Sequence, residues 1–129
     1  MGILLTGRTI FERALSLCGL RGSGDALPSD LADLEVRGLD FLNGLIAENT
    51  MLNRRLTGHV HPLQELTGLE ETVALSERLC AVLAYGLAAL MMAEEDPSLY
   101  GILDARYRAG RQQLLADGKS RVHAIREVC

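Results

Sequence analysis

The sequence predicts a small all-α protein, a four-helix bundle with a long loop between the second and third helices and an extended C-terminal tail. Hydrophobic residues make up 48% of the 129 residues but aromatic residues only 4%, so leucine and alanine must form the core. The stretch from Cys80 to Ala93 carries no charge, yet it is shorter than the roughly 20 residues that span a bilayer. Apolar residues in three further segments recur at helical spacing.

The uncharged stretch predicts the central helix, over residues 75–95. Alanine, leucine and methionine dominate it, and all three favour helix. Ser76 is a candidate N-cap. Five leucines form one stripe: Leu75, Leu79, Leu83, Leu87 and Leu90. Because other apolar residues widen this stripe almost to the whole circumference, we expect the helix to contact the other three.

A shorter helix is expected near the N-terminus. Thr6 or Thr9 can cap it, and Thr9 with Glu12 matches a capping box. Gly19 is placed to end it as a C-terminal cap. Its apolar face comprises Ile10, Phe11, Ala14, Leu15 and Cys18. The following residues 21–28, RGSGDALP, have the composition of a loop.

The second helix is expected to follow an N-cap at Ser29, directly after Pro28. Asp30 and Asp33 lie in its first turn, where the helix dipole favours negative charge. The helix is expected to fray near Asn49. Its apolar stripe comprises Leu31, Leu34, Leu39, Leu42, Leu45 and Ile46.

Residues 50–72 lose this periodicity and predict a long loop. Gly58 and Pro62 make a central strand unsuitable there. A loop of about twenty residues in a compact domain tends to be functional. Its basic and imidazole side chains are Arg54, Arg55, His59 and His61. They are either docking residues or a solvated loop, and a metal site is disfavoured because the two histidines have no third ligand nearby in sequence.

The fourth helix is expected to begin at Pro97, because proline suits a first helical turn. Asp104 and Arg108 are placed for an ion pair one turn apart. Gly118 is expected to end the helix. The chain is therefore divided into a helical domain, residues 1–118, and a C-terminal docking tail, residues 119–129. The apolar stripe comprises Leu99, Leu103, Tyr107, Gly110 and Leu114.

Charge and cysteine content exclude several classes of protein. The net charge is −4, whereas a DNA-binding module usually has a basic surplus. Three widely spaced cysteines argue against a disulfide framework and fit a reducing cytoplasm. The N-terminus lacks the pattern of a signal peptide, and we expect neither a transmembrane segment nor a membrane partner.

No catalytic motif is recognisable, so we expect no enzyme and no cofactor. The sequence has no phosphate-binding loop, nucleophile elbow or metalloprotease motif. An acidic cluster, Glu94, Glu95 and Asp96, follows the central helix, where the dipole prefers cations. It is either a solvated helix end or a site for an arginine, Arg106 or one from another chain.

Three landmarks in the sequence resemble head–tail connector proteins of tailed phages. The first is a short helix ending at Leu17–Leu20. The second is a helix with acidic residues at its start, Asp30 and Asp33, that ends in a leucine–asparagine pair, Leu42–Asn43. The third is a leucine–alanine-rich helix that follows Leu66-Thr67. The resemblance covers about three-quarters of the chain and includes head-completion or adaptor proteins and packaged-DNA stabilisation (tail accessory) factors.

The resemblance implies a structural virion protein of the neck, made in the host cytoplasm. Members form a ring, usually of twelve copies, beneath the portal protein, extend the DNA channel and dock the next neck or tail protein, a stopper or tail terminator. Double-stranded DNA passes through without sequence-specific binding. The short stretch between the second and third helices departs from the podophage accessory factors, which have a longer β-rich insertion there, and is closer to the compact adaptors of long-tailed phages.

Three sets of residues are assigned from this role. The channel wall is expected to be acidic, so that phosphates slide past it: Asp33, Glu35, Asp40 and Glu48. The tail is expected to dock on the portal: Arg121, Val122, Ile125, Arg126 and Val128. The loop is expected to contact the tail-side neighbour or the adjacent subunit: Arg54, Arg55, His59 and His61. The alternatives are a small helical DNA-packaging regulator similar to a terminase small subunit, which the acidic charge disfavours, and an unrelated helical interaction module.

Overall fold

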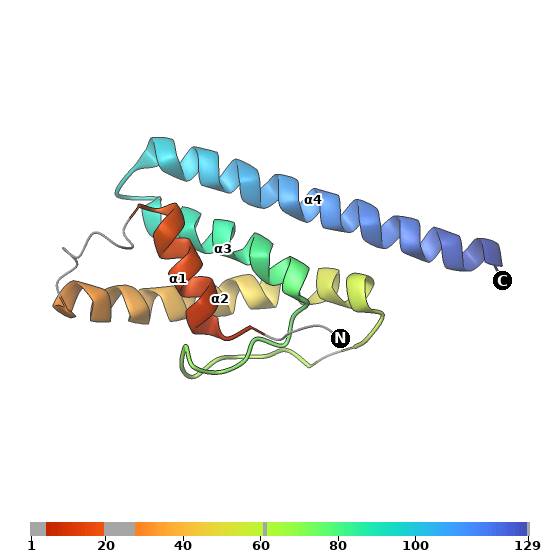
Figure 1. Cartoon of the computed structure of the whole chain (residues 1–129), viewed down its shortest axis with the longest axis horizontal. Helices are drawn as coiled ribbons and strands as arrows, with labels where there is room; N and C mark the ends of the chain where they lie inside the picture. Colours follow the sequence, from red (N-terminus) through yellow and green to blue (C-terminus); the bar gives the residue numbers. More distant parts are fainter. Residues whose placement is uncertain (1–4, 20–27, 61, 129) are drawn as a thin grey trace.

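The fold is a bundle of four helices, as the sequence predicts (Figure 1). This computed structural model describes the backbone of residues 5–19, 28–60 and 62–128, and the side chains of residues 5–19, 32–60 and 62–117. The helices in the described chain are α1 (Gly7–Leu17), α2 (Pro28–Thr57), α3 (Glu77–Met92) and α4 (Pro97–Val128). The described residues contain no strand, only an isolated antiparallel bridge between Thr6 and Thr72.

The central helix is α3, which packs against each of the other three helices. In Figure 1 it lies between α4 and α2, and α1 crosses it. Leu83 and Leu87 are completely buried, as the sequence predicts. One apolar cluster includes residues from all four helices and from the segment before α3, so the described part of the chain has a single continuous core.

The expected helix ends are confirmed at four places. Thr6, the first of the two candidate caps, accepts a hydrogen bond through Oγ1 from the Thr9 N–H at 3.2 Å. Ser76 caps α3 in the same way on the Leu79 N–H. Gly19 follows α1 with φ +76°, in the left-handed region that favours glycine. The fourth is Pro97, the first residue of α4.

Three helix contacts depend on a missing β-carbon. A β-carbon at Gly38 of α2 would lie 2.6 Å from the Phe11 ring of α1. One at Gly86 of α3 would lie 2.8 Å from the Tyr107 ring of α4, and one at Gly110 of α4 would lie 2.9 Å from a methyl group of Val82 on α3. Each glycine therefore lets one side chain of a neighbouring helix approach its backbone closely.

Three expected boundaries are wrong. The N-terminal end of α2 lies at Pro28, so Ser29 is inside the helix and is not its cap. The same helix does not fray near Asn49 but continues to Thr57, so Arg54 and Arg55 lie in its last turn and not in the loop. Its continuation is stabilised by tertiary hydrogen bonds of two buried asparagines, described below.

The third wrong boundary is Gly118, because α4 passes through it and continues to Val128. The 32 residues of α4 make it about 48 Å long, against about 24 Å for the 16 residues of α3. The C-terminal tail therefore continues α4 as far as Val128, whereas it was expected to be separate from the helix. It extends beyond the other helices (Figure 1), and we call residues 118–128 the α4 extension.

Candidate functional site

The loop between α2 and α3, residues 58–76, is fixed to the bundle by a side chain of α2. The Asn43 amide pairs with the backbone of Leu66 in both directions: its Nδ2 donates to the Leu66 carbonyl at 2.9 Å, and its Oδ1 accepts from the Leu66 N–H at 2.7 Å. The Asn43 amide thus gives the Leu66 backbone the two hydrogen bonds that a neighbouring β-strand would give it in a sheet. As a result the Leu66 side chain is buried in the core.

Two more amides hold the second half of the loop. Gln64 spans its two arms, because its Nε2 donates to the Thr72 carbonyl at 2.8 Å and its Oε1 accepts from the Ala74 N–H at 2.9 Å. Asn53 of α2 accepts a 2.8 Å hydrogen bond from the Ser76 N–H at the start of α3. Three side-chain amides thus supply the partners that a strand would supply in a sheet.

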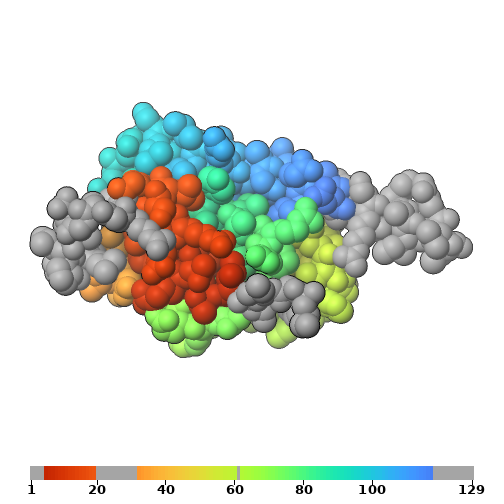
Figure 2. Space-filling view, viewed as in Figure 1, coloured from red at the N-terminus to blue at the C-terminus, as the bar shows by residue number. Residues whose placement is uncertain are grey.

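The loop also pairs with the chain that leads into α1. The N–H groups of Gly7 and Arg8 donate to carbonyls of the loop, and the Val73 N–H donates to the Leu5 carbonyl at 2.7 Å. The Arg8 guanidinium hydrogen-bonds to Glu35 of α2 and to Glu70 of the loop. These hydrogen bonds raise the pKa of Arg8 further above its already high value, so the guanidinium remains charged at any physiological pH. Figure 2 shows α1 and the loop together on one face of the molecule.

The loop and the end of α2 present apolar and basic groups to solvent. Val60 and Leu63 are 72% and 68% exposed. Arg54 and Arg55, which precede them on α2, are also exposed, and so is His59. His61 lies outside the described residues. The three described residues of the expected docking surface, Arg54, Arg55 and His59, are therefore all exposed to solvent. Two exposed apolar side chains, Val60 and Leu63, lie near them in sequence, and the charge pattern did not indicate these.

A second surface is a groove between α2 and α4, with a volume of about 720 Å³. Its floor comes from α3: Gly86, Ala89 and Leu90. The α2 wall comprises Leu45, Glu48, Met51, Leu52 and Arg55. The α4 wall comprises Tyr100, Asp104, Tyr107, Arg108, Arg111, Gln112 and Leu115. These α4 residues lie on one side of the helix over about 22 Å, so the groove follows the helix axis.

A polar network closes one side of the groove. The Tyr107 hydroxyl donates to Glu48 Oε1 at 2.7 Å and accepts from Asn49 Nδ2 at 2.9 Å. Arg111 Nε donates to Asn49 Oδ1 at 2.8 Å, and its guanidinium lies 5.7 Å from the centre of the Tyr107 ring. Burial raises the pKa of Tyr107 to about 12, so the hydroxyl keeps its proton. This network orders α2 against α4.

The rim of the groove has a surplus of one positive charge. The positively charged side chains that line it are Arg55, Arg108 and Arg111, and the negatively charged ones are Glu48 and Asp104. Arg108 forms the expected ion pair with Asp104 one turn before it, at 2.9 Å. Arg111 lies 3.6 Å from Glu48. Within the described chain no ion pair of Arg55 is found, and its side chain is exposed at the open edge of the groove.

The four carboxylates assigned to the channel wall are not on one face. Asp33 and Asp40 are exposed and lie two turns apart on the outer face of α2. Glu35 lies about 200° around the helix from Asp33 and binds Arg8 at 2.9 Å. Glu48 accepts the Tyr107 hydrogen bond. A place in the channel wall therefore stays a prediction, and Glu35 and Glu48 already have internal partners.

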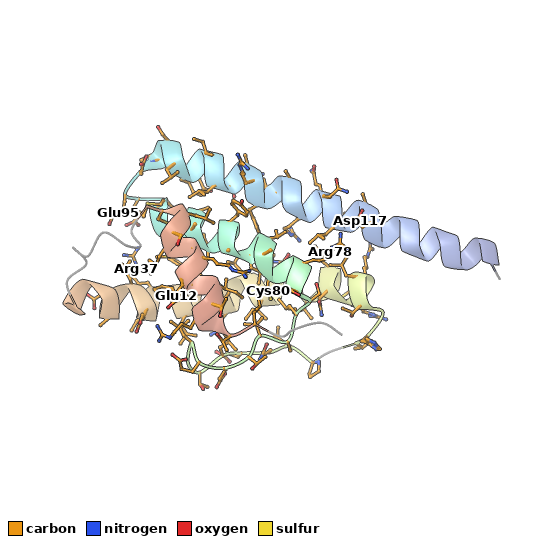
Figure 3. All side chains as sticks on the ribbon, viewed as in Figure 1. Glu12, Arg37, Arg78, Cys80, Glu95 and Asp117 are labelled. Carbon is orange, nitrogen blue, oxygen red and sulfur yellow. The ribbon has the colours of Figure 1, made fainter. Side chains whose placement is uncertain are left out.

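The remaining assigned groups lie at the two ends of the molecule. The side chains of Arg121, Val122, Ile125, Arg126 and Val128 lie outside the described residues, although their backbone belongs to the α4 extension. Glu94, Glu95 and Asp96 are exposed. In the described chain no ion pair joins Arg106 to this cluster, and Asp96 instead accepts from the Leu99 N–H at 3.1 Å. In Figure 3, Glu95 lies at the opposite end of the molecule from the Arg78–Asp117 ion pair.

The cysteines and histidines do not form a reactive or metal-binding group among the described residues. Burial raises the pKa of Cys18 and of Cys80 to about 11, so both remain thiols at neutral pH. No group of three or more potential metal ligands occurs in the described chain. Nor is any described helix both long and apolar enough to cross a membrane.

Comparison with protein-family models, with curated proteins and with solved structures found no match. The function must therefore be argued from the sequence resemblance and from the surfaces described above.

Proposed function

We propose that this chain is a head-to-tail adaptor of a tailed phage. In this role, copies of the chain form a ring beneath the portal, for which the resemblance implies twelve copies. The ring extends the DNA channel and presents a surface to the next neck or tail protein. The proposal rests on the resemblance of the sequence to phage connectors. The arrangement of the fold adds support, because α4 runs along one side of α3 and projects beyond the other helices, whereas the loop lies on the other side of α3 (Figure 1).

The observation that supports the proposal most is the length of α4. A helix about twice as long as the one it packs on has no intramolecular reason to continue, since helical stability in proteins comes mostly from packing. The α4 extension carries arginines and apolar residues at helical spacing: Arg121, Val122, Ile125, Arg126 and Val128. These residues suit a partner with acidic and apolar groups, and we assign that partner as the portal.

The loop between α2 and α3 supplies the second docking surface. Its hydrogen bonds to Asn43, Asn53 and Gln64 fix its backbone before any partner binds. A preformed loop loses little conformational entropy on binding. Val60 and Leu63 provide apolar contact beside Arg54, Arg55 and His59, and we assign this surface to the tail-side neighbour or the adjacent subunit.

The test is attachment to portal-bearing heads that lack tails. We expect deletion of residues 119–129 to abolish attachment and to leave the thermal unfolding of the bundle cooperative, because the core residues described in α4, Leu103, Tyr107 and Leu114, all precede the deleted segment. The double change Arg121→Glu, Arg126→Glu should weaken attachment, because it reverses two charges of the docking segment. Arg106→Glu, an exposed arginine of α4 within the bundle, is the matched control and should attach as the parent does.

Two results would contradict this account. One is a truncated chain that joins heads at the occupancy of the parent, which would reject the assignment of the tail to the portal and move that contact to the loop. The other is tight, salt-dependent binding of duplex DNA in a gel-shift titration, which would favour the packaging regulator instead. Rings seen at the portal vertex by electron microscopy would support the adaptor.

A further inference from the structure

The groove between α2 and α4 has the form of a binding site for a helix. Its walls are single faces of two long helices, and its floor is formed by the small residues Gly86 and Ala89 with Leu90. A groove of this kind accepts an amphipathic helix through a few apolar anchors. No residue of α1 or of the loop lines it, so α4 and α2 are its only walls in the described chain.

The same molecule exposes a helix face that matches the groove. Val36 on the outer side of α2 is 72% exposed, although it is a β-branched apolar residue in mid-helix. Asp33 lies one turn before it and Asp40 one turn after it, and both are exposed. Arg37 lies between the two carboxylates in sequence, with its guanidinium 6.0 Å from the centre of the Phe41 ring, so these three charged residues together carry a net charge of −1. We call Asp33, Val36 and Asp40 the α2 outer patch.

We infer that the α2 outer patch of one copy occupies the α2–α4 groove of a second copy. Val36 is placed against the apolar lining near Met51, which is itself 64% exposed. Asp33 and Asp40 pair with the rim arginines, of which Arg55 has no ion-pair partner in the described chain. Two carboxylates thus meet a rim with a surplus of positive charge, and this complementarity favours the acidic patch of a second copy over a basic or neutral occupant.

This contact joins two different surfaces, so it is heterologous. Each copy offers its patch to one neighbour and its groove to the other, and such an arrangement closes into a ring when the rotation between copies permits it. The inference rests on the proposed adaptor function for its ring, and it names the surfaces that join neighbours. It also moves Asp33 and Asp40 from the channel wall to the contact between subunits.

The contact is small, because a few helical turns bury less than the roughly 1,200 Å² of a standard interface. Self-association must therefore be measured by sedimentation velocity over a range of protein concentrations. The parent chain should form dimers and larger species as concentration rises. One double variant, Asp33→Arg with Asp40→Arg, is designed to inactivate the patch. A second double variant, Met51→Glu with Arg55→Glu, is designed to inactivate the groove. All four side chains are exposed, so both variants should keep the helical spectrum and melting behaviour of the parent.

Each variant alone should dissociate at least about tenfold more readily than the parent. An equimolar mixture of the two should form a one-to-one pair and nothing larger, because one intact patch then meets one intact groove. The matched control is Arg78→Gln, Asp117→Asn, which removes an ion pair outside the groove and the patch with no net change of charge and should associate as the parent does. As a direct check, Val36→Cys and Met51→Cys chains, both with Cys129→Ser, should form a mixed disulfide on oxidation.

Several results would overturn the inference. They are a parent chain that stays monomeric at every concentration, variants that associate as the parent does, or a mixture that does not pair. None of these would reject the adaptor function, since a portal can gather subunits by itself. If the Asp33, Asp40 variant assembles normally on heads but alters retention of packaged DNA, the two carboxylates belong to the channel wall. If the parent chain itself does not attach to portal-bearing heads, the adaptor function is rejected instead.

Discussion

Asn43 holds Leu66 by both polar atoms of its side-chain amide, although the two residues are 23 positions apart. This pair joins α2 to the loop and brings the Leu66 side chain into the core. Asn43→Leu should cost about 1–3 kcal/mol, because the Leu66 N–H and carbonyl lose their partners in a half-buried position. Chemical denaturation measures the cost, and hydrogen exchange should show faster exchange at Leu66.

The neighbouring residue provides the control for that change. A β-carbon at Gly44 would meet nothing within 4 Å, so Gly44→Ala should be neutral or stabilising by up to about 1 kcal/mol through helix propensity. If Asn43→Leu denatures at the same midpoint as the parent, the amide does not brace the loop.

Gly86→Ala should destabilise the bundle by about 1–3 kcal/mol. The new methyl group would lie 2.8 Å from the Tyr107 ring and 3.2 Å from a Leu45 methyl group, so α4 must shift away from α3. Gly101→Ala is the matched control on α4, because its methyl group meets nothing within 4 Å. Equal melting temperatures for the two variants would contradict the close approach of α3 and α4.

Leu83→Ala should cost about 2–5 kcal/mol, since it removes a completely buried side chain from the central helix. Urea unfolding of the parent and the variant measures this difference. The exposed residue Leu63 is the control, and Leu63→Ala should change the free energy of unfolding by less than about 0.5 kcal/mol. An unchanged urea midpoint for Leu83→Ala would refute the central place of α3.

Stability should fall at alkaline pH. Cys18 and Cys80 have a folded-state pKa of about 11 and Tyr107 one of about 12, each raised chiefly by burial. In the unfolded chain these groups lose their protons first, between about pH 9 and 10, so the folded state then binds more protons. The contribution of these three groups to the free energy of unfolding should therefore decline from about pH 9 to pH 12. Tyr107→Phe should flatten the decline above pH 10, and an unchanged slope there would argue against a buried hydroxyl.

The sequence was sufficient to predict the helices where local signals and packing agree. The leucine stripe of α3, the caps Thr6 and Ser76 and the break at Pro97 are short-range features, and all are confirmed. Asn49 and Gly118 were misread as helix ends, because their low helix propensity is a local signal. At Asn49 that signal is overcome by hydrogen bonds to Tyr107 and Arg111, residues that are distant in sequence.

The surfaces were less predictable than the fold. The basic residues near the loop were visible in the sequence, but the groove requires the relative placement of α2 and α4, which no local pattern gives. The acidic residues of α2 could be counted but not assigned to a face, because Glu35 pairs with Arg8 of another helix. The helical spacing of Asp33, Val36 and Asp40 was the one available signal for an outer patch, since an apolar residue stands there opposite the leucine stripe.

The three glycine contacts have a consequence for how relatives of this chain can diverge. Gly38 accommodates Phe11, Gly86 accommodates Tyr107 and Gly110 accommodates Val82. A larger residue at any of these glycines requires a smaller one at its partner, so the two members of each pair should change together. In an alignment of homologues we expect covariation between positions 38 and 11, 86 and 107, and 110 and 82. The exposed Gly44 and Gly101, by contrast, should vary without a compensating change inside the same subunit.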